Sequence, residues 1–339
     1  MTDDDARLTA RPSAAVTLSD VAREARVGES TASRVLRSQG SFSEKTRKRV
    51  AEAAERLGYT PNRIAGTLAS TGSRLIGIVV PSFANIVFSD VLSGANRALD
   101  AAGFQSVIGL SEYQQEREEH IVRSLLSWRP AGLILAGLEH SPATTAMLRN
   151  SGVRIAELLD IDGEGIDIVV GFSNVQAGRA SAAFLLSRGY RNIGYVGHDL
   201  ERDRRAAKRF AGFSAALAEQ GISLADHDIS PAPSSVEAGQ AGLTRLLERG
   251  TRLDAVYFSN DDMALGGYFL CQSKGIAIPE KLALFGYNGL DIARFTPLPL
   301  STIRTPRLKI GETGAHLIAT GAPPQTVDLG FELIEGATA

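Results

Sequence analysis

Cysteine and long apolar segments are almost absent from this chain of 339 residues. The single cysteine, Cys271, excludes an internal disulfide framework. No run of about 18 apolar residues is present, which excludes an ordinary membrane-spanning helix. The first 15 residues are acidic and have no apolar core, so we expect no secretory signal there. These absences predict a cytoplasmic protein, and a length of 339 residues predicts two or three globular domains.

The motifs of common enzyme classes are also missing. No G-x-G-x-x-G follows an expected strand, which disfavours a dinucleotide site. His198 and Asp199 suggest a hydrolase, but there is no G-x-S-x-G motif to supply a nucleophile. Neither the histidines nor Cys271 show metal-ligand spacing. We therefore predict that the chain is not an enzyme and uses no cofactor or metal. The five histidines are His120, His140, His198, His227 and His316.

The net charge of −2 is small, but it is unevenly distributed along the chain. Residues 16–74 hold 11 Lys and Arg against six Asp and Glu, a balance of +5. Residues 75–339 hold 23 basic against 29 acidic residues, a balance of −6. A basic head on an acidic body is expected when one end of a protein meets a polyanion. A solvated helical surface is the alternative explanation of the charge run.

The basic region has the periodicity of three short helices. We expect the first to begin at a cap on Ser19, with a break over 26–28 before the second helix at 29–37. The third should begin at Ser43 and end near Gly58. Small alanines on the expected inner faces suit a helix-turn-helix, in which the second helix reads DNA bases.

The head resembles the DNA-binding headpiece of the lactose/galactose-repressor family along its whole length. A structural three-helix bundle without DNA binding is the alternative. The segments that carry the resemblance are VTLSDVA, TASRVL, SEKTRKRV and LGYTPNRIAGTLA.

The resemblance implies roles for individual residues of the head. Glu29 and Ser30 occupy the positions that choose operator bases, where a glutamate accepts from cytosine N4. Leu68 matches a leucine that wedges into the minor groove and bends the DNA; packing on its own domain is the alternative. The DNA-binding positions implied in this way are Thr17, Ser19, Glu29, Ser30, Thr31, Ser33, Arg34, Asn62, Arg63, Ala65 and Leu68.

Three residues of the head depart from the family pattern. Arg26 stands where the family has glycine in the turn, and Gly28 stands at a usual Ser or Thr cap. Because a non-glycine residue is strained at positive φ, we expect the turn to shift locally. Gly66 lies in the expected hinge helix, where glycine costs about 0.5–1 kcal/mol relative to alanine. We therefore predict a hinge that is disordered without DNA and folds on it.

The body, from residue 75 onward, alternates short apolar runs with helical segments. Continuous apolar runs indicate parallel strands buried on both faces. There are too many for one compact sheet, so we predict an α/β core of two doubly wound parallel-sheet subdomains, periplasmic-binding-protein-like, with a ligand cleft at the carboxyl ends of the strands. The expected strands are 75–81, 104–110, 132–137, 154–160, 166–172, 192–197, 255–260 and 282–288; the expected helices include 86–102, 177–188, 206–219 and 236–249.

The body resembles the sugar-binding core of the same family, and several segments resemble its gluconate-responsive repressors. Among these are SLLSW, IDIVVGFSN, SNDDMA and DLGFEL. Family members that bind neutral sugars commonly carry Asp where this chain has Asn288, which favours an anionic ligand such as gluconate. The charged segment 201–209 is expected to be a solvated helix surface except for Arg209. The implied effector-binding residues are Phe83, Asn85, Phe88, Asp160, Phe172, Arg209, Asn260, Asp262 and Asn288.

The complete hypothesis is a ligand-controlled, sequence-specific transcriptional regulator, expected to repress carbohydrate catabolism genes. A homodimer without a tetramerising tail would bind a pseudopalindromic operator in double-stranded DNA, without membrane attachment. The alternatives are an activator or co-repressor-dependent regulator, and a sugar-binding transport protein. The expected segments are a disordered extension (1–15), a helix-turn-helix domain (16–61), a hinge and linker (62–74) and an effector-binding, dimerising core (75–335).

Overall fold

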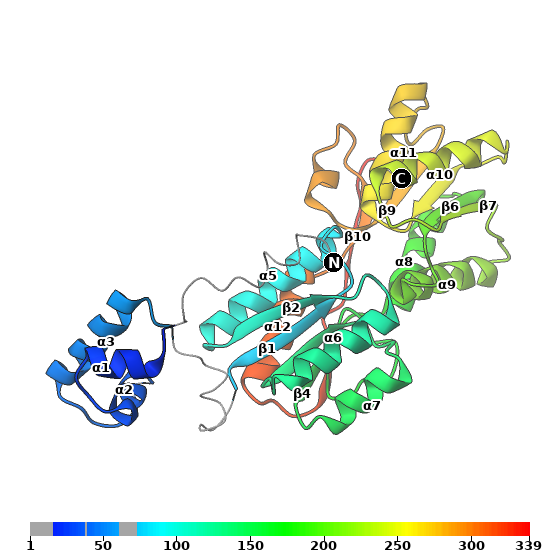
Figure 1. The fold of residues 1–339 in the computed structure, drawn as a ribbon. Coiled ribbons are helices and arrows are strands. Elements are labelled where there is room, and N and C mark those ends of the chain that lie inside the picture. The colour runs from blue at the N-terminus through cyan, green and yellow to red at the C-terminus, as the bar shows by residue number, and fades with distance from the viewer. Residues whose placement is uncertain (1–15, 38, 61–72) are drawn as a thin grey trace, which may run out of the picture. The chain divides into compact units, whose positions relative to one another are not determined.

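The computed structural model describes residues 16–37, 39–60 and 73–339, which belong to two compact units divided after residue 72 (Figure 1). The expected N-terminal extension and hinge lie outside the described residues, apart from 73 and 74. No helix in the described ranges is long and apolar enough to cross a membrane. The same ranges contain no cluster of three or more His, Cys, Asp or Glu residues suited to a metal ion.

The head is a three-helix unit around a small apolar core that includes Val21, Ala32 and Val50. The first helix is capped by Thr17 rather than Ser19, so that part of the sequence prediction was wrong. Thr17 and Asp20 form a reciprocal capping box, which satisfies two amide donors at once. The helices are α1 (Leu18–Glu24), α2 (Glu29–Leu36) and α3 (Glu44–Leu57), and α3 has the expected Ser43 cap and left-handed Gly58 end.

The turn between α1 and α2 retains a left-handed residue despite the absence of glycine. Arg26 adopts a φ of 53°, and the Val27 amide closes the turn by donating to the Ala22 carbonyl at 3.0 Å. Gly28 is the N-cap of α2. The backbone therefore accepts the strain at Arg26 instead of shifting to avoid it.

The second unit contains two six-stranded sheets, which we call the sheets of the N-lobe and the C-lobe. The N-lobe sheet has the order β11-β5-β4-β3-β1-β2, and every pair is parallel. Its strands are β1 (Leu75–Val80), β2 (Gln105–Leu110), β3 (Gly132–Ala136), β4 (Arg154–Leu158), β5 (Ile168–Gly171) and β11 (Gln325–Asp328).

The C-lobe sheet has the order β12-β10-β9-β8-β6-β7. It is parallel except at its edge, where β12 runs antiparallel to β10. The predicted two-sheet α/β class is confirmed with this one exception. The strands are β6 (Ile193–His198), β7 (Asp226–Ser230), β8 (Ala255–Phe258), β9 (Ala283–Asn288), β10 (Ser301–Arg304) and β12 (Glu332–Ile334).

Helices cover both faces of each sheet, so most strands are buried on both sides. In the N-lobe, α5 packs against α12, although 205 residues separate the two helices in the sequence. In the C-lobe, α8 packs on α9 and α10 on α11 (Figure 1). The N-lobe helices are α5 (Ile86–Ala101), α6 (Gln115–Ser127), α7 (Pro142–Asn150) and α12 (Arg307–Ala319); those of the C-lobe are α8 (Asn174–Ser187), α9 (Arg204–Glu219), α10 (Val236–Glu248), α11 (Asp261–Lys274) and the 3-10 helix η1 (Asp291–Arg294).

Candidate functional site

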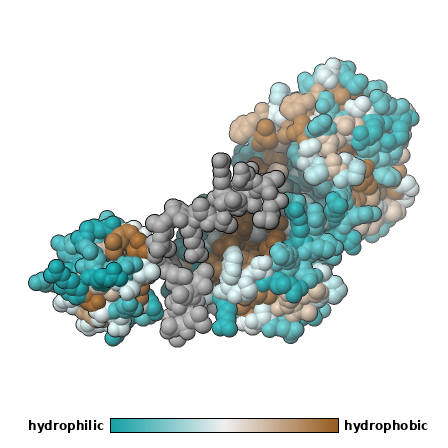
Figure 2. All heavy atoms as spheres, viewed as in Figure 1, coloured by the Kyte–Doolittle hydropathy of each residue, from teal (hydrophilic) through white to brown (hydrophobic). Residues whose placement is uncertain are grey.

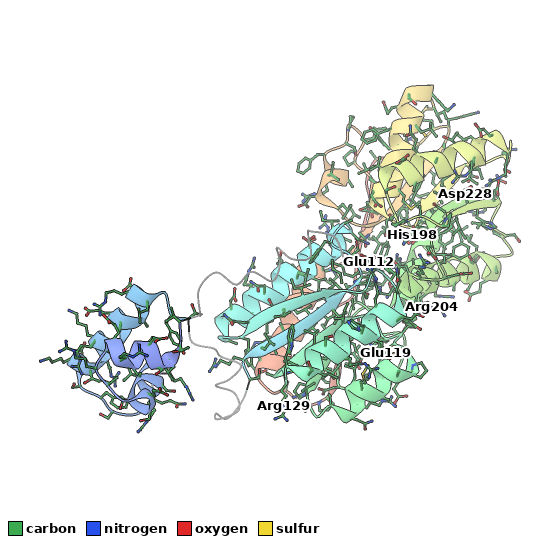
Figure 3. All side chains as sticks on the ribbon, in the orientation of Figure 1. Glu112, Glu119, Arg129, His198, Arg204 and Asp228 are labelled. Carbon is green, nitrogen blue, oxygen red and sulfur yellow. The ribbon has the colours of Figure 1, made fainter. Side chains whose placement is uncertain are left out.

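A polar cavity lies between the two lobes, close to the carboxyl ends of their central strands. Its open space is only about 30 Å³, room for about two water molecules. Larger hollows of about 100 and 650 Å³ adjoin it, and Asp203 lines all three. Glu112 of the N-lobe and His198 of the C-lobe, both labelled in Figure 3, line the hollow of about 100 Å³. The cavity is lined by Asn85, Val87, Phe88, Leu159, Phe172, Asn174, Asp203, Arg205, Arg209, Asn260, Tyr287, Asn288 and Thr305.

Four long helices begin at this cavity. Asn85, Asp203 and Asn260 are the N-caps of α5, α9 and α11, and Asn174 is the first residue of α8. This convergence follows from the topology, because each helix begins after the carboxyl end of a parallel strand. Helix N-termini carry partial positive charge, so the backbone itself favours an anion here.

Arg209 lies at the floor of the cavity and is 6% exposed. Its guanidinium stacks over the Tyr287 ring at 4.0 Å, and its Nη1 donates to Asn174 Oδ1 at 3.1 Å. Nε has no hydrogen-bond partner among the described residues, and neither has the buried Tyr287 hydroxyl. Burial opposes the charged form, but Tyr287 and Asp203 outweigh it and raise the pKa of Arg209. Arg209 therefore places a permanent positive charge at the floor of the cavity, and its Nε–H can still donate a hydrogen bond to a ligand.

A close helix crossing sets the position of Arg209. A Cβ on Gly178 of α8 would lie 1.9 Å from the Arg209 carbonyl oxygen. Gly212 of α9 approaches Val175 of α8 in the same way, with a Cβ distance of 2.2 Å from the Val175 carbonyl oxygen. No side chain larger than hydrogen fits either place, so α9 lies directly on α8 and carries Arg209 to the cavity.

Asp203 and Arg205 form the side of the cavity at the start of α9. Asp203 caps the helix by accepting from the Ala206 amide at 3.1 Å. Burial works against its ionisation, but Arg205, His198 and Arg209 outweigh that effect and lower the pKa of its carboxyl. Arg205 is 9% exposed, lies over the Phe88 ring of the N-lobe at 5.1 Å, and has its Nε 3.8 Å from Asp203 Oδ1. Asp203 thus remains a buried anion beside two cations.

His198 belongs to a buried polar chain, but not with the partner suggested by the sequence. Its Nε2 lies 3.2 Å from Asp203 Oδ2, and its Nδ1 lies 2.8 Å from Ser259 Oγ. Asp199 instead accepts from the Arg202 amide in the following loop. Ser259 is 1% exposed, so the chain serves to fix Asp203 at the cavity wall.

Two cavity residues have backbone conformations that disfavour side chains. Leu159 has a φ of 76° and Asn288 a φ of 108°, in the left-handed region usually left to glycine. The Asn288 side chain donates from Nδ2 to Asn260 Oδ1 at 2.9 Å, and its carbonyl accepts from Arg307. These two hydrogen bonds hold the strained backbone of Asn288 in place.

Six of the nine predicted effector residues line the cavity, and three do not. Phe83 is 52% exposed on the loop before α5. Asp262 accepts from the Ser234 hydroxyl at 2.6 Å. Asp160 is fully buried behind the cavity, where it accepts from Asn174 Nδ2 at 3.2 Å and pairs with Lys208.

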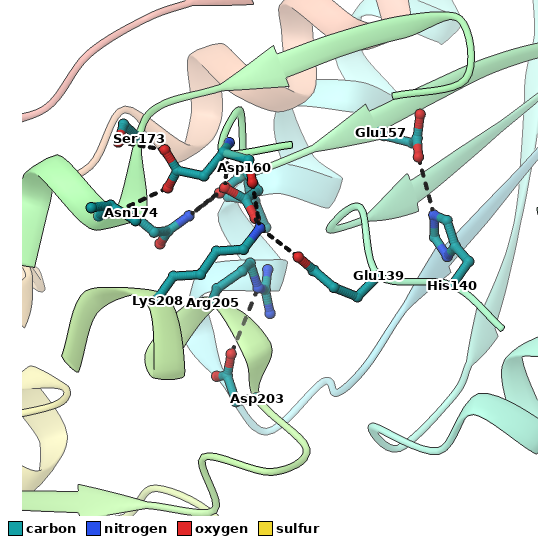
Figure 4. A network of polar contacts seen from close by, with 12 residues as sticks. Glu139, His140, Glu157, Asp160, Ser173, Asn174, Asp203, Arg205 and Lys208 are labelled. Carbon is teal, nitrogen blue, oxygen red and sulfur yellow. Dashed lines mark hydrogen bonds and ion pairs between the residues drawn. The ribbon is translucent and has the colours of Figure 1, made fainter. Parts of the chain in front are cut away.

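Lys208 overturns the prediction that segment 201–209 is a solvated surface except for Arg209. Its Nζ contacts Asp160 and Glu139, both of the N-lobe, and donates to the Asp162 carbonyl at 3.0 Å (Figure 4). Arg205 is buried as well. The missed cavity residues include Asn174, Asp203, Arg205, Tyr287 and Thr305; the spacing of Arg205 and Arg209, four apart on one helix, was the available signal.

In the head, α2 presents most of the predicted base-reading residues to solvent. Glu29, Ser30 and Arg34 are exposed, while Ala32 of the same helix is buried. Arg34 also lies over the Phe42 ring at 5.4 Å. The Thr17 side chain is engaged in the capping box, Ser19 and Thr31 are partly buried, and the Ser33 hydroxyl accepts from Arg37. Asn62, Arg63, Ala65 and Leu68 lie outside the described residues.

The chain matches two protein families that agree with this arrangement. Residues 17–62 match the bacterial regulatory proteins of the lacI family. Residues 73–323 match the periplasmic binding proteins and sugar binding domain of the LacI family. The chain belongs to the LacI family. It is therefore a DNA-binding transcriptional regulator and not an enzyme, as the sequence predicted.

Individual LacI-family relatives extend the likeness over nearly the whole chain. The HTH-type transcriptional regulator GntR of Pseudomonas aeruginosa is 38% identical over 339 residues, covering 98% of this chain and 97% of the relative. A solved LacI-family transcriptional regulator from Silicibacter pomeroyi has a TM-score of 0.91 at 40% identity, covering 95% of this chain and 99% of that one. The lac repressor dimer bound to operator and the anti-inducer ONPF has a TM-score of 0.81 at 25% identity, covering 96% and 99%.

Proposed function

We propose that this chain is a homodimeric repressor of carbohydrate catabolism genes whose operator affinity is controlled by a gluconate-like sugar acid in the inter-lobe cavity. The observation that carries the proposal is the pair of buried arginines, Arg205 and Arg209, facing one cavity at which four helix N-termini meet. Cations and helix N-termini stabilise a carboxylate. Asn85, Asn260 and Asn288 add donors and acceptors suited to hydroxyl groups.

The DNA-reading part of the proposal assigns the operator to the head. Glu29, Ser30 and Arg34 are exposed on α2, so their side chains are free to contact base edges and phosphates. Thr17, Ser19, Thr31 and Ser33 are assigned to supporting backbone contacts. The hinge residues Asn62, Arg63, Ala65 and Leu68 are assigned to the minor groove. The assigned segments are a helix-turn-helix domain over 16–61, a hinge over 62–74 and an effector core over 75–335.

The homodimer is supported by an exposed apolar surface on the C-lobe. Phe269 of α11 is 49% exposed, and Ile292 and Phe295 near η1 are 61% and 80% exposed. The amide of Leu298 donates to the Tyr268 hydroxyl at 3.2 Å, which joins the segment after η1 to α11. Brown and tan atoms gather on this part of the C-lobe (Figure 2). Burial of such a surface against a second copy stabilises a dimer.

Control by the effector follows from the two-lobed construction. The cavity, at about 30 Å³, is much smaller than an ordinary small-molecule site. A sugar acid therefore binds only if the lobes rearrange, and its affinity is coupled to their relative position. If one lobe arrangement favours operator binding, the effector shifts the population between the two states, with a coupling of about 1–3 kcal/mol.

Fluorescence anisotropy on the promoter DNA of the chain's own gene tests this function. We expect specific binding that weakens about 5- to 150-fold when gluconate is added. Arg209→Ala should bind DNA normally and lose the response, while Leu68→Ala should lose specific affinity and keep some non-specific binding. Binding no tighter than to random duplex would overturn the regulator assignment for this DNA. Tighter binding with gluconate would reverse the sign to co-repression.

A further inference from the structure

Arg205 is an almost buried cation without a hydrogen bond. It is 9% exposed, and in the part of the chain that the structure describes none of its donors takes part in a hydrogen bond. Its contacts are the Phe88 ring at 5.1 Å and Asp203 at 3.8 Å, which is beyond hydrogen-bond length. Unlike Arg209 Nε, its nitrogen atoms are not fully buried, so they are open to a hydrogen-bonding partner from the adjoining space. The cavity that it lines is where such a partner would bind.

Arg209 points a second unused donor at the same space. Its Nε is buried without a partner among the described residues. Arg205 and Arg209 are four residues apart on α9, so their side chains leave the same face of the helix. Two guanidinium groups in this arrangement match the two oxygens of one carboxylate.

The charge of the cavity limits the ligand to one negative group. Its charged lining side chains are Arg205, Arg209 and Asp203, a formal balance of +1. The remaining polar residues that line this cavity are neutral amides and hydroxyls, and two further arginines, Arg202 and Arg204, line the adjoining hollow of about 650 Å³ instead. A phosphate elsewhere on the ligand would be desolvated in this cavity without a counter-charge.

Building on the proposed sugar-acid function, we propose that Arg205 is the residue that selects a monoanionic aldonate, by holding its carboxylate together with Arg209. Neutral sugars and alditols bind more weakly because their hydroxyl groups offer the two guanidinium groups no counter-charge. Phosphorylated aldonates are rejected because their second anionic group meets neutral amides and Asp203. Arg205 thus sets specificity, whereas Arg209 is required for any ligand in this cavity.

Calorimetric titration of the full-length protein with four probes tests the assignment: gluconate, gluconamide, glucitol and 6-phosphogluconate. Gluconamide replaces only the carboxylate by a neutral amide. For the native chain we expect gluconate to bind roughly 10- to 100-fold more tightly than each of the other three. In Arg205→Gln the preference for gluconate over gluconamide should fall to about threefold or less, with little change in gluconamide affinity.

Arg149→Gln is the matched control, because Arg149 is an exposed arginine on α7 that lines none of the three hollows. It removes the same charge and should leave all four affinities within about twofold. An unchanged gluconate preference in Arg205→Gln would overturn the role of Arg205. Equal binding of 6-phosphogluconate would overturn the limit to monoanions. If none of the probes binds while operator binding persists, both this assignment and the proposed sugar-acid effector fail, but DNA binding by the head does not.

Discussion

The two lobes of the core have closely similar sheets but contribute different chemistry to the cavity. All three charged lining residues, Asp203, Arg205 and Arg209, come from α9 and its N-cap in the C-lobe. The N-lobe lining is mainly apolar, with Phe88 and Leu159 as examples. The same architecture therefore separates charge recognition in one lobe from an apolar cover in the other. The charge of the proposed sugar acid would therefore be read mainly by the C-lobe, with the N-lobe as its apolar cover.

The asymmetry reverses just outside the cavity. There the N-lobe supplies buried or half-buried acids, Asp160 and Glu139, and the C-lobe supplies Lys208 to pair with both. Arg205 over Phe88 is a second contact across the cleft. Ionic and cation–π contacts thus already join the two lobes, and the proposed effector would add to them.

The largest effect is expected from a comparison of one tight helix crossing in each lobe, which tests whether the charged lining of the C-lobe matters more than the apolar lining of the N-lobe. A Cβ on Gly178 would meet the Arg209 carbonyl oxygen at 1.9 Å, and one on Gly311 of α12 would meet the Val91 carbonyl oxygen at 2.0 Å. Alanine at either position should destabilise the core by about 1–3 kcal/mol through overpacking. Only Gly178→Ala displaces the charged helix, so its effector affinity should fall about 100-fold, against about fivefold or less for Gly311→Ala.

Urea unfolding measures the predicted loss of stability, and calorimetric titration of the same samples measures the predicted loss of effector affinity. The two variants should unfold at comparable denaturant concentrations. Equal losses of effector affinity at equal stability would show that the N-lobe contributes as much to recognition as the C-lobe.

The predictability of the fold also differed between central and edge strands. Eight strands were expected from their apolar runs; seven of them are buried, and the eighth, β2, is an edge strand without a buried residue. The edge strands β7, β11 and β12 were missed because they are short and none of their residues is buried. Their sequences are DHDIS, QTVD and ELI. β10, with the sequence STIR, is buried but too short and polar to form a recognisable run. Periodicity detects burial, and these strands acquire their place from pairing with neighbours.

The site was predictable where residues follow strands, and less so where they begin helices. Phe172 directly follows β5 and Asn288 ends β9, so the rule for parallel sheets located them. Asp203 and Arg205 follow a charged loop, and composition alone suggests a solvated surface there. Only the three-dimensional packing of α9 on α8 turns Arg205 and Lys208 inward. The same rule placed Asp160 in the cavity because it follows β4. In the structure Asp160 is buried against Lys208 and does not line the cavity.

A smaller effect is expected from removing the cross-lobe ion pair. Lys208→Met should weaken effector binding by about 3- to 10-fold, because the lobes lose a contact that favours closure. It should also destabilise the protein, since Asp160 is left buried without a counter-charge. Calorimetry for affinity and urea unfolding for stability measure the two consequences separately.

Two further variants separate closure from stability. Asp160→Asn added to Lys208→Met should recover much of the stability but not the effector affinity. Arg245→Met, which removes an ion pair with Asp228 within the C-lobe, should change effector affinity by less than about twofold. If restoring stability also restores affinity, Lys208 supports folding only and does not bias the lobes.

The smallest expected difference between the lobes is in the pH range over which each loses stability. In the N-lobe, burial opposes protonation of His140, but Glu118 and Glu157 outweigh it and raise its pKa to about 9. Its Nδ1 lies 2.7 Å from Glu118 Oε1 and its Nε2 lies 3.3 Å from Glu157 Oε1. In the C-lobe, burial raises the pKa of Asp261 to about 7, against the opposing hydrogen bonds from Thr302 and Leu290.

Both groups bind protons more tightly in the folded protein than in the unfolded chain. The stability that each contributes is therefore lost as pH rises, but over different pH ranges. The contribution of His140 is complete below its unfolded pKa of about 6.5 and is lost as pH rises through about 9. That of Asp261 is complete below about 4 and is lost as pH rises through about 7. Asp261→Asn should flatten the lower window in C-lobe strands, and His140→Gln the upper window in N-lobe strands. Hydrogen exchange of β8 and β3 at pH 4–9 measures the stability of each lobe separately. If the slope of stability against pH persists in both variants, other groups cause the pH dependence and this distinction between the lobes is lost.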